Sequence, residues 1–162
     1  ERRTMTKPFT IRPATASDAG WIHALHTHSV SALCKDHYSP EQISGWLKNR
    51  CPQGYLSGIA GIKRGEMFVA EAGPQIVGFG HAVPGEIRAI YVAPENAQQG
   101  VGFRLLAYGI EKARAGSHRD VCLDATLNAL DFYKKAGFVE VEQSSVRRNN
   151  ILLPIVRMLL TA

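Results

Sequence analysis

The sequence predicts a single α+β domain in which helices flank one mixed β-sheet. Apolar residues recur at helical spacing in some segments and alternate in others, which indicates both kinds of element. Three strand-like runs follow one another across short turns, which favours antiparallel pairing. A later run comes only after roughly 25 residues, which favours a parallel crossover. The 162 residues, 45% of them hydrophobic, suffice for one core.

A strand and two helices are predicted at the N-terminal end. The run FTIRPAT is strand-like, and Thr15 with Asp18 forms a capping box that predicts a helix through about Leu33. A second capping box, Ser39 with Gln42, predicts another helix with a proline at its first position. The inward face of the first helix is predicted to hold Ile22, Leu25, His26, Ser29 and Leu33.

The remaining elements alternate between strands and helices. The runs MFVAEA, QIVGFGHAV and GEIRAIYVA predict an antiparallel meander, because the turn signals between them are short. A helix follows, then the strand DVCLDA, a short helix ending at Gly137, and two last strands, FVEVEQ and ILLPIVRML. The core face of the long helix is predicted to hold Phe103, Leu106, Ile110 and Ala113.

Composition and charge argue against several partners. The net charge of +5 and the pI near 9.3 suit a polyanionic ligand. The basic residues are spread out and not interleaved with aromatics, so we expect no nucleic-acid partner. No apolar run approaches the ~20 residues of a membrane helix. Three scattered cysteines favour a reducing cytoplasm. Residues 1–8 are predicted to be a disordered or vector-derived tail, with one domain over 9–162.

Two glycines, Gly100 and Gly102, stand between a strand-like run and a helical pattern. A P-loop is excluded because Phe-Arg follows the second glycine, where a Lys-Ser/Thr pair is needed. A dinucleotide-binding loop would have a third glycine at the position of Leu105. Two alternatives remain. One is a tight left-handed turn; the other is a loop whose backbone N–H groups, from Gln98 to Phe103, bind a pyrophosphate.

A second pattern about 20 residues later favours the pyrophosphate loop. The loop AQQGVG and the run NALDFYKKAGF resemble, in order and spacing, the two signatures of the GNAT superfamily of acyl-CoA-dependent N-acetyltransferases. The predicted order of elements resembles that family over residues 9–160, and HYSPEQISGW resembles its small bacterial members. One departure is Ala97, where the family usually has Gln or Arg; backbone N–H donors do not depend on that side chain.

The resemblance implies a splayed sheet that holds acetyl-CoA between its fourth and fifth strands. The residues implied to bind it lie on the strand before the loop, in the loop and in the second signature. They are Ile90, Tyr91, Val92, Gln98, Gln99, Gly100, Val101, Gly102, Phe103, Arg104, Asn128 and Tyr133.

The resemblance also implies direct attack of an amine on the thioester, with no covalent intermediate on the enzyme. Tyr133 matches the tyrosine that would protonate the departing thiolate, and a phenol is a reasonable donor there. Glu86, fourteen residues before Gly100, is the candidate base. His81 and a water chain to bulk solvent are the alternatives. The oxyanion donor would be a backbone N–H of the same strand.

Other polar residues have structural alternatives. Asn128 is either a pantetheine contact or the N-cap of its helix, with Asp131 at the third position. The histidines of the run HALHTH have a spacing that could suit a metal ion, but no carboxylate or cysteine completes a ligand set, so we predict no metal. His26 could instead help to line the acceptor pocket, and Trp46 has the spacing of a core residue.

The acceptor site is expected to form from the first two helices and their loop, where Asp36, His37, Tyr38 and Glu41 lie. Acidic residues there would suit a cationic amine.

The sequence therefore predicts a cytoplasmic acetyltransferase that uses acetyl-CoA and the primary amine of a small molecule or peptide. The alternatives are a non-catalytic acyl-CoA-binding sensor and, less well supported, a nucleotide-dependent oxidoreductase. A homodimer through the C-terminal strands is possible.

Overall fold

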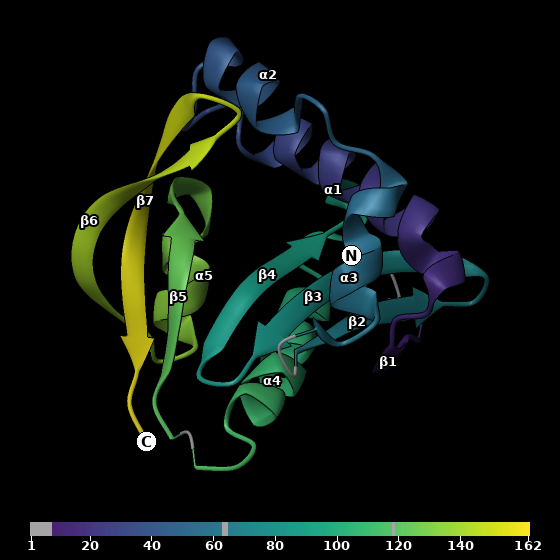
Figure 1. Ribbon diagram of the computed structural model, residues 1–162. Coiled ribbons are helices and arrows are strands. Elements are labelled where there is room, and N and C mark those ends of the chain that lie inside the picture. Colours follow the sequence, from purple (N-terminus) through teal and green to yellow (C-terminus); the bar gives the residue numbers. More distant parts are fainter. Residues whose placement is uncertain (1–7, 63–64, 118) are drawn as a thin grey trace, which may run out of the picture.

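The computed structural model describes residues 8–62, 65–117 and 119–162 of the chain. They form one seven-stranded sheet in the order β1-β2-β3-β4-β5-β7-β6 (Figure 1). Apart from Pro8, the predicted tail lies outside the described residues. The strands are β1 (Thr10–Pro13), β2 (Glu66–Ala72), β3 (Gln75–Val83), β4 (Glu86–Val92), β5 (Val121–Thr126), β6 (Val139–Arg148) and β7 (Ile151–Leu160).

Five α-helices flank the sheet (Figure 1): α1 (Ala19–Leu33), α2 (Pro40–Leu47), α3 (Leu56–Ile59), α4 (Val101–Ala113) and α5 (Leu130–Lys135). Both predicted capping boxes are present. Thr15 and Asp18 cap the 3₁₀ turn that leads into α1, and Ser39 and Gln42 cap α2. The two helix starts are therefore confirmed.

The sheet lies between two helical layers, and β2 shows how the sequence builds them. Successive side chains of a strand point to opposite faces. Phe68 and Ala70 pack in the cluster that includes α4, whereas Met67 and Val69 pack against α1. Because both faces are covered, β2 is apolar in every position of its middle and does not alternate.

The pairing of β4 with β5 is short, and this shapes the site. These strands are parallel, as the long crossover predicted, but they pair only at Glu86–Cys122 and Ile87–Leu123. Beyond these residues the strands diverge (Figure 1). In the pairing of β4 with β3, Arg88 is an extra residue, so β4 carries a bulge at the point where it leaves β5. The splay predicted from the family resemblance is confirmed.

Three details of the predicted helices are wrong. Leu33, predicted on the inward face of α1, is 38% exposed, because it lies at the last residue of the helix. Phe103 is 44% exposed instead of packing in the core, because Leu105 and Leu106 supply the apolar stripe of α4. Asn128 does not cap α5, since it lies inside a 3₁₀ turn and Ala129 takes the cap position. One-residue shifts of this kind follow from turns that tighten the start of a helix.

The outer strand of the sheet, β6, is solvent-exposed over nearly its whole length. Val139, Val141 and Leu152 of β6 and β7 are each more than half exposed. The possible homodimer stays a prediction. Within the described residues, no helix is both long enough and apolar enough to cross a membrane.

Candidate active site

Two cavities lie on either side of the gap between β4 and β5, and they meet. The first, which we call the groove, has a volume of about 450 Å³ and lies beside the glycine loop. The second, the acceptor cavity, has a volume of about 310 Å³ and lies under α1 and α2. Tyr91 of β4 and Thr126 of β5 line both. The two cavities are therefore adjacent at the splay.

The glycine loop, residues 98–103, lies at one end of the groove and has backbone N–H groups without a partner within the helix. Gln98 and Gly100 both adopt left-handed backbone conformations, with φ of 63° and 84°, and Gly100 is the N-cap of α4 without a side-chain cap. The first N–H groups of a helix have no partner within it. Alternating left- and right-handed residues turn successive N–H groups toward one concavity, which is an anion-binding geometry. The loop therefore offers donors suited to a pyrophosphate.

Gly102, the second glycine of the loop, is required for a different reason. A Cβ at Gly102 would lie 3.2 Å from the ring of Phe132, which is tighter than ordinary contact. Phe132 in turn packs on Phe103, with 4.8 Å between ring centroids. Gly100 is thus needed for its backbone conformation and Gly102 for the close packing of α4 against α5.

Most of the predicted cofactor-binding residues line the groove. They are Ile90, Tyr91, Val92, Gln98, Gly100, Gly102, Phe103 and Asn128. Ala97, the departure from the family signature, lines it as well, together with Lys135.

The other four predicted contacts do not line the groove; Tyr133, which lines neither cavity, is described below. Val101 is buried, so only its backbone is available to a ligand. Gln99 Nε2 donates to the carbonyl of Glu95, and the guanidinium of Arg104 lies over the ring of Phe9, 4.7 Å from its centroid. Their side chains are therefore not part of the groove wall.

Asn128 joins the groove wall to α1. Its Oδ1 accepts a hydrogen bond from Cys34 Sγ at 3.4 Å. Burial raises the pKa of Cys34 to about 11, so its thiol stays protonated at neutral pH. Cys34 consequently positions Asn128 and has little thiolate character.

Tyr133 is buried beneath the groove and is 7% exposed. Its ring packs between those of Phe132 and Phe138, with centroid distances of 5.0 and 5.8 Å. Burial raises the pKa of Tyr133 well above its usual range. Burial also raises that of Tyr91, and charge on Cys34 or Tyr133 would raise it further. Tyr91 and Tyr133 are thus electrostatic neighbours, both neutral at physiological pH.

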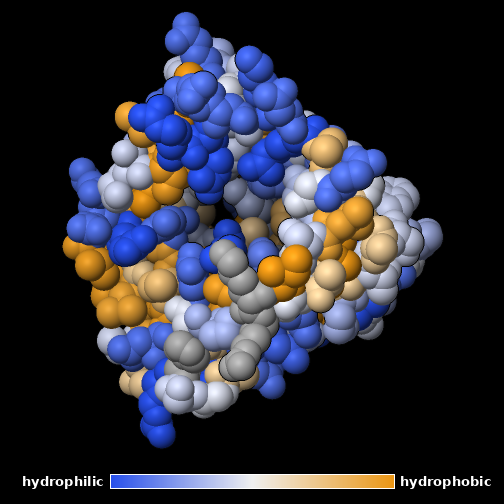
Figure 2. Space-filling view, viewed as in Figure 1, coloured by the Kyte–Doolittle hydropathy of each residue, from blue (hydrophilic) through white to orange (hydrophobic). Residues whose placement is uncertain are grey.

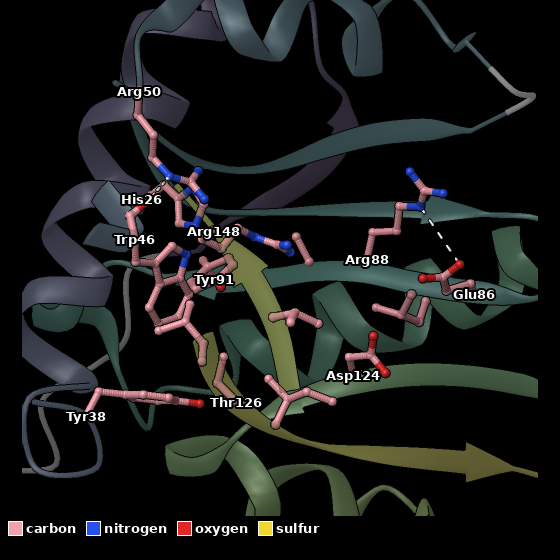
Figure 3. A pocket seen from close by; sticks show the side chains of 15 residues that line it. His26, Tyr38, Trp46, Arg50, Glu86, Arg88, Tyr91, Asp124, Thr126 and Arg148 are labelled. Carbon is pink, nitrogen blue, oxygen red and sulfur yellow. Dashed lines mark hydrogen bonds and ion pairs between the residues drawn. The ribbon is translucent and has the colours of Figure 1, made fainter. Parts of the chain in front are cut away.

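The acceptor cavity opens as a hollow where β4 and β5 diverge, and hydrophilic residues surround it (Figure 2). Its walls come from α1, α2 and the chain after α2, from β4 and β5, and from β6 and β7. Figure 3 shows two ends. His26, Trp46, Arg50 and Arg148 gather at one, and Glu86 and Arg88 lie at the other, with Asp124 nearby.

Glu86, the predicted base, lines the acceptor cavity at the first residue of β4. Its Oε2 lies 3.9 Å from Nε of Arg88, and both side chains are about two-fifths exposed. Asp124 lies on the facing strand and pairs with Arg157 at 3.1 Å. The structure therefore brings two carboxylates to the end of the splay where β4 and β5 are still paired.

His26 is predicted to face inward and does so, with 6% exposure. Its Nδ1 accepts a hydrogen bond from Arg50 Nη1 at 2.9 Å and lies 2.8 Å from Tyr55 Oη. Burial, with the charge of Arg50, lowers the pKa of His26 to about 3. The ring is therefore neutral, and because Nδ1 accepts, the proton is on Nε2.

His81, the second choice as base, lies in a separate small cavity beside Tyr55 and Gly58. Its Nε2 has no hydrogen-bond partner among the described residues. Burial lowers its pKa, and Arg88 lowers it further. His81 is outside the set of residues that line the acceptor cavity, so the structure favours Glu86.

The acidic residues expected at the acceptor site lie away from the cavity. Asp36 and Glu41 are exposed, and His37 lines the groove. Tyr38 does line the acceptor cavity, and its Oη accepts from the backbone N–H of Leu127 while donating to the carbonyl of Pro154. Tyr38 thus ties the end of β5 to β7.

Sequence reasoning missed the basic side chains of this cavity. Arg50, Arg88 and Arg148 are far apart in the chain, and each has the local signal of a solvated surface residue. Trp46, predicted as core, is buried and also lines the cavity. Within the described residues, no cluster of three potential metal ligands is present.

Comparison with known proteins identifies the family of this chain. Residues 34–161 match the family described as acetyltransferase (GNAT) domain. The chain belongs to this family. A curated relative, the uncharacterized N-acetyltransferase YafP of Escherichia coli K12, is 28% identical over 139 residues, which are 84% of this chain and 85% of that protein.

Solved structures agree with the family. The GCN5-related N-acetyltransferase from Rhodopseudomonas palustris superimposes over 100% of both chains, with a TM-score of 0.89 and 26% identity. PaiA N-acetyltransferase from Thermoplasma acidophilum, in complex with coenzyme A, has a TM-score of 0.77 and 18% identity, covering 96% of this chain and 99% of its own. The predicted GNAT fold is confirmed, and this second structure is one of several neighbours that contain coenzyme A or acetyl-CoA.

Proposed function

We propose that this GNAT protein transfers the acetyl group of acetyl-CoA to the primary amine of a small molecule or peptide, by direct attack in a ternary complex. One observation carries the proposal. The groove and the acceptor cavity share Tyr91 and Thr126 in their walls. Both residues lie where β4 and β5 no longer pair with each other. Two substrates can thus approach each other from opposite sides of one gap.

The groove fits acetyl-CoA from its loop to the splay. The uncapped start of α4, with Gln98 and Gly100 in left-handed conformations, would hold the pyrophosphate through N–H groups. Lys135 lines the same groove and adds positive charge. The pantetheine arm would extend along Ile90 and Asn128 toward the acceptor cavity.

The bulge in β4 supplies backbone donors for the thioester. Beyond Ile87, β4 has no strand partner on the side of β5, so the backbone N–H and C=O groups on that side are available to water or a ligand. A preorganised N–H near Arg88 or Ala89 would stabilise the negative charge that develops on the carbonyl oxygen.

Tyr133 would act as the general acid. Its buried phenol stays protonated, as an acid requires, and it lies directly behind Phe132 of the groove wall.

The protonated state of two cysteine thiols supports direct attack without a covalent intermediate. Burial raises the pKa values of Cys34 and Cys122, so neither has the thiolate character of a nucleophile.

Glu86 would accept the proton of the attacking amine, either directly or through a water molecule. It lines the acceptor cavity close to the point where β4 and β5 separate. A positioned base of this kind contributes about 10²- to 10⁴-fold to a rate.

The test is a calorimetric titration with acetyl-CoA, with NADH as a control, followed by an amine screen that detects released thiol. We expect binding of acetyl-CoA but not of NADH, and turnover with at least one primary amine. Binding of acetyl-CoA without turnover of any amine would favour the non-catalytic sensor. Absence of binding would contradict both functions.

A further inference from the structure

We propose that the acceptor is a small amine that also carries a carboxylate, and that Arg50, Arg148 and His26 bind this carboxylate at the end of the acceptor cavity remote from Glu86. The inference deepens the proposed function and rests on it for the role of the amine. It replaces the expectation of an acidic acceptor loop, since Asp36 and Glu41 lie away from the cavity.

The positive charge at this end has no carboxylate partner among the described residues. Arg50 and Arg148 both line the cavity, and within the described part of the chain neither makes an ion pair with a carboxylate. Arg148 donates to the carbonyl of Arg147, at 3.2 Å, and to no other described residue. Two guanidinium groups that face one cavity repel each other, and an anion between them would remove that repulsion.

Arg50 is already held in place. Its Nε donates to the carbonyl of Trp46 at 3.1 Å, and its Nη1 donates to Nδ1 of His26 at 2.9 Å. Its Nη2 makes no hydrogen bond to a described residue. A side chain that is fixed before binding loses little conformational entropy when a ligand arrives. Arg50 thus presents a free donor in a fixed direction.

His26 adds a second donor that the protein does not use. Its Nε2 is buried and has no hydrogen-bond partner in the described structure, and its ring lines the cavity. Because Nδ1 accepts from Arg50, Nε2 carries the hydrogen of the neutral ring. A buried donor without a partner costs free energy, and a carboxylate oxygen would satisfy it.

The two ends of the cavity differ in charge. The described lining has no carboxylate beside Arg50 and Arg148, whereas Glu86 and Asp124 lie at the far end. There Glu86 pairs with Arg88, and Asp124 pairs with Arg157. A zwitterion would therefore lie with its carboxylate toward Arg50 and its amine toward Glu86 (Figure 3). This places the amine toward Arg88 and Ala89, the part of β4 whose backbone N–H groups we propose for the thioester carbonyl.

The side wall selects the substituent of such a molecule. Besides its charged groups, the cavity is lined by Trp46 and by Val146, Leu153 and Ile155 of β6 and β7. These residues offer an apolar surface to a side chain. An α-amino acid with an apolar or aromatic side chain offers one group to each of these surfaces, and Glu86 would reach its amine through a water molecule.

The experiment compares amines that differ only in the carboxylate. The pairs are leucine with 3-methylbutylamine and phenylalanine with 2-phenylethylamine. Affinity for the complex with coenzyme A is measured by calorimetry, and turnover with acetyl-CoA by thiol release. A charged hydrogen-bonded contact contributes roughly 1.5–3 kcal/mol, so we expect the better amino acid to bind at least about tenfold more tightly than its partner.

Two variants locate the contact. Arg148→Gln should remove most of the preference for the carboxylate by raising KM for the amino acid, with little change for the neutral amine. Arg147→Gln is the matched control, because Arg147 is the neighbouring residue of β6 and lies outside the cavity lining. This control should keep the preference.

The outcomes separate the two proposals. Equal or tighter binding of the neutral amines, no binding of any amino acid, or a preference that survives Arg148→Gln would overturn the carboxylate site. Turnover of neutral amines alone would leave the acetyltransferase function standing and the inference wrong. Carboxylate-dependent binding that Arg148→Gln abolishes, without turnover, would support the inference and contradict catalysis.

Discussion

The groove and the acceptor cavity lie side by side but are built differently. The groove comes largely from two short stretches of chain, residues 90–103 and 126–135, and its anion-binding part is backbone. The acceptor cavity is lined by side chains from four strands, two helices and the chain before and after α2. Many of its polar groups are charged side chains. A backbone site depends on conformation, which local sequence specifies, whereas a side-chain site depends on where distant elements meet.

This difference predicts different mutational behaviour. In the groove, changes of backbone conformation should matter more than changes of charge. In the acceptor cavity, single charged or hydrogen-bonding side chains should dominate. Four substitutions test this contrast.

The largest effect is expected at Tyr133, beneath the groove. Tyr133→Phe removes the buried phenol and keeps the ring packing against Phe132 and Phe138. If Tyr133 protonates the leaving thiolate, kcat should fall about 10²- to 10⁴-fold, while acetyl-CoA affinity stays nearly unchanged. Tyr108→Phe is the matched control, because Tyr108 packs on Phe68 away from both cavities. Equal rates for the two variants would remove Tyr133 from catalysis.

Glu86→Gln should act on the acceptor side alone. It keeps the size of the side chain but removes the base, so kcat should fall by roughly 10²-fold or more, with acetyl-CoA binding intact. Steady-state rates with one amine would measure this. Glu41→Gln, an exposed glutamate of α2 outside the cavity, should leave the rate unchanged. Wild-type activity of Glu86→Gln would favour the water chain as base.

The third prediction concerns the neutral state of His26 in the acceptor cavity. Its folded-state pKa, about 3, is below the ordinary histidine value of 6.5, so the unfolded chain binds more protons between these values. Its contribution to stability is therefore complete above pH 6.5 and is lost as the pH falls toward 3. Between pH 7 and pH 5 the free energy of unfolding should fall by about 2 kcal/mol from this group.

Urea denaturation at both pH values measures this loss. His26→Gln should show a correspondingly smaller pH dependence. His28→Asn, which changes an exposed histidine of the same helix, should keep the wild-type dependence. If both variants keep the wild-type dependence, His26 is charged in the native protein, and its Nδ1 cannot accept the hydrogen bond from Arg50 that holds the guanidinium in place.

The smallest effect is expected in the groove. Gly100→Ala and Gly116→Ala both place a side chain at a positive φ, 84° and 79°, with open space around the new Cβ. Each should cost about 1 kcal/mol of stability. Only Gly100→Ala should also weaken acetyl-CoA binding, by about tenfold, because Gly116 lies outside the groove. Unchanged affinity in Gly100→Ala would reduce the loop to an ordinary turn.

Much of the fold was predictable because its signals are local. The capping boxes at Thr15 and Ser39 involve residues three positions apart, and both form as predicted. The parallel pairing of β5 with β4 followed from the length of the crossover. The failures are also local. The tight 3₁₀ turn before α5 shifted its start past Asn128, and the apolar stripe of α4 runs through Leu105 instead of Phe103.

The site divides in the same way. The loop from Gln98 to Gly102 and the run containing Tyr133 carried the resemblance to the GNAT family, and the family match confirms it. The roles of Tyr133 and Glu86 stay predictions. Arg50 and Arg148 could not be assigned from sequence, since an arginine after a helix or near a hairpin turn is usually solvated.

By itself, the sequence determined the family, the order of elements, and the glycine loop with its left-handed backbone, because each depends on residues close together in the chain. Only the tertiary structure decided where β4 and β5 part, that Arg50 is held against a neutral His26, and that Arg148 meets both in one cavity. These contacts join residues far apart in sequence. Their geometry depends on how α1, α2 and the β6–β7 hairpin pack around the sheet, which local patterns do not specify.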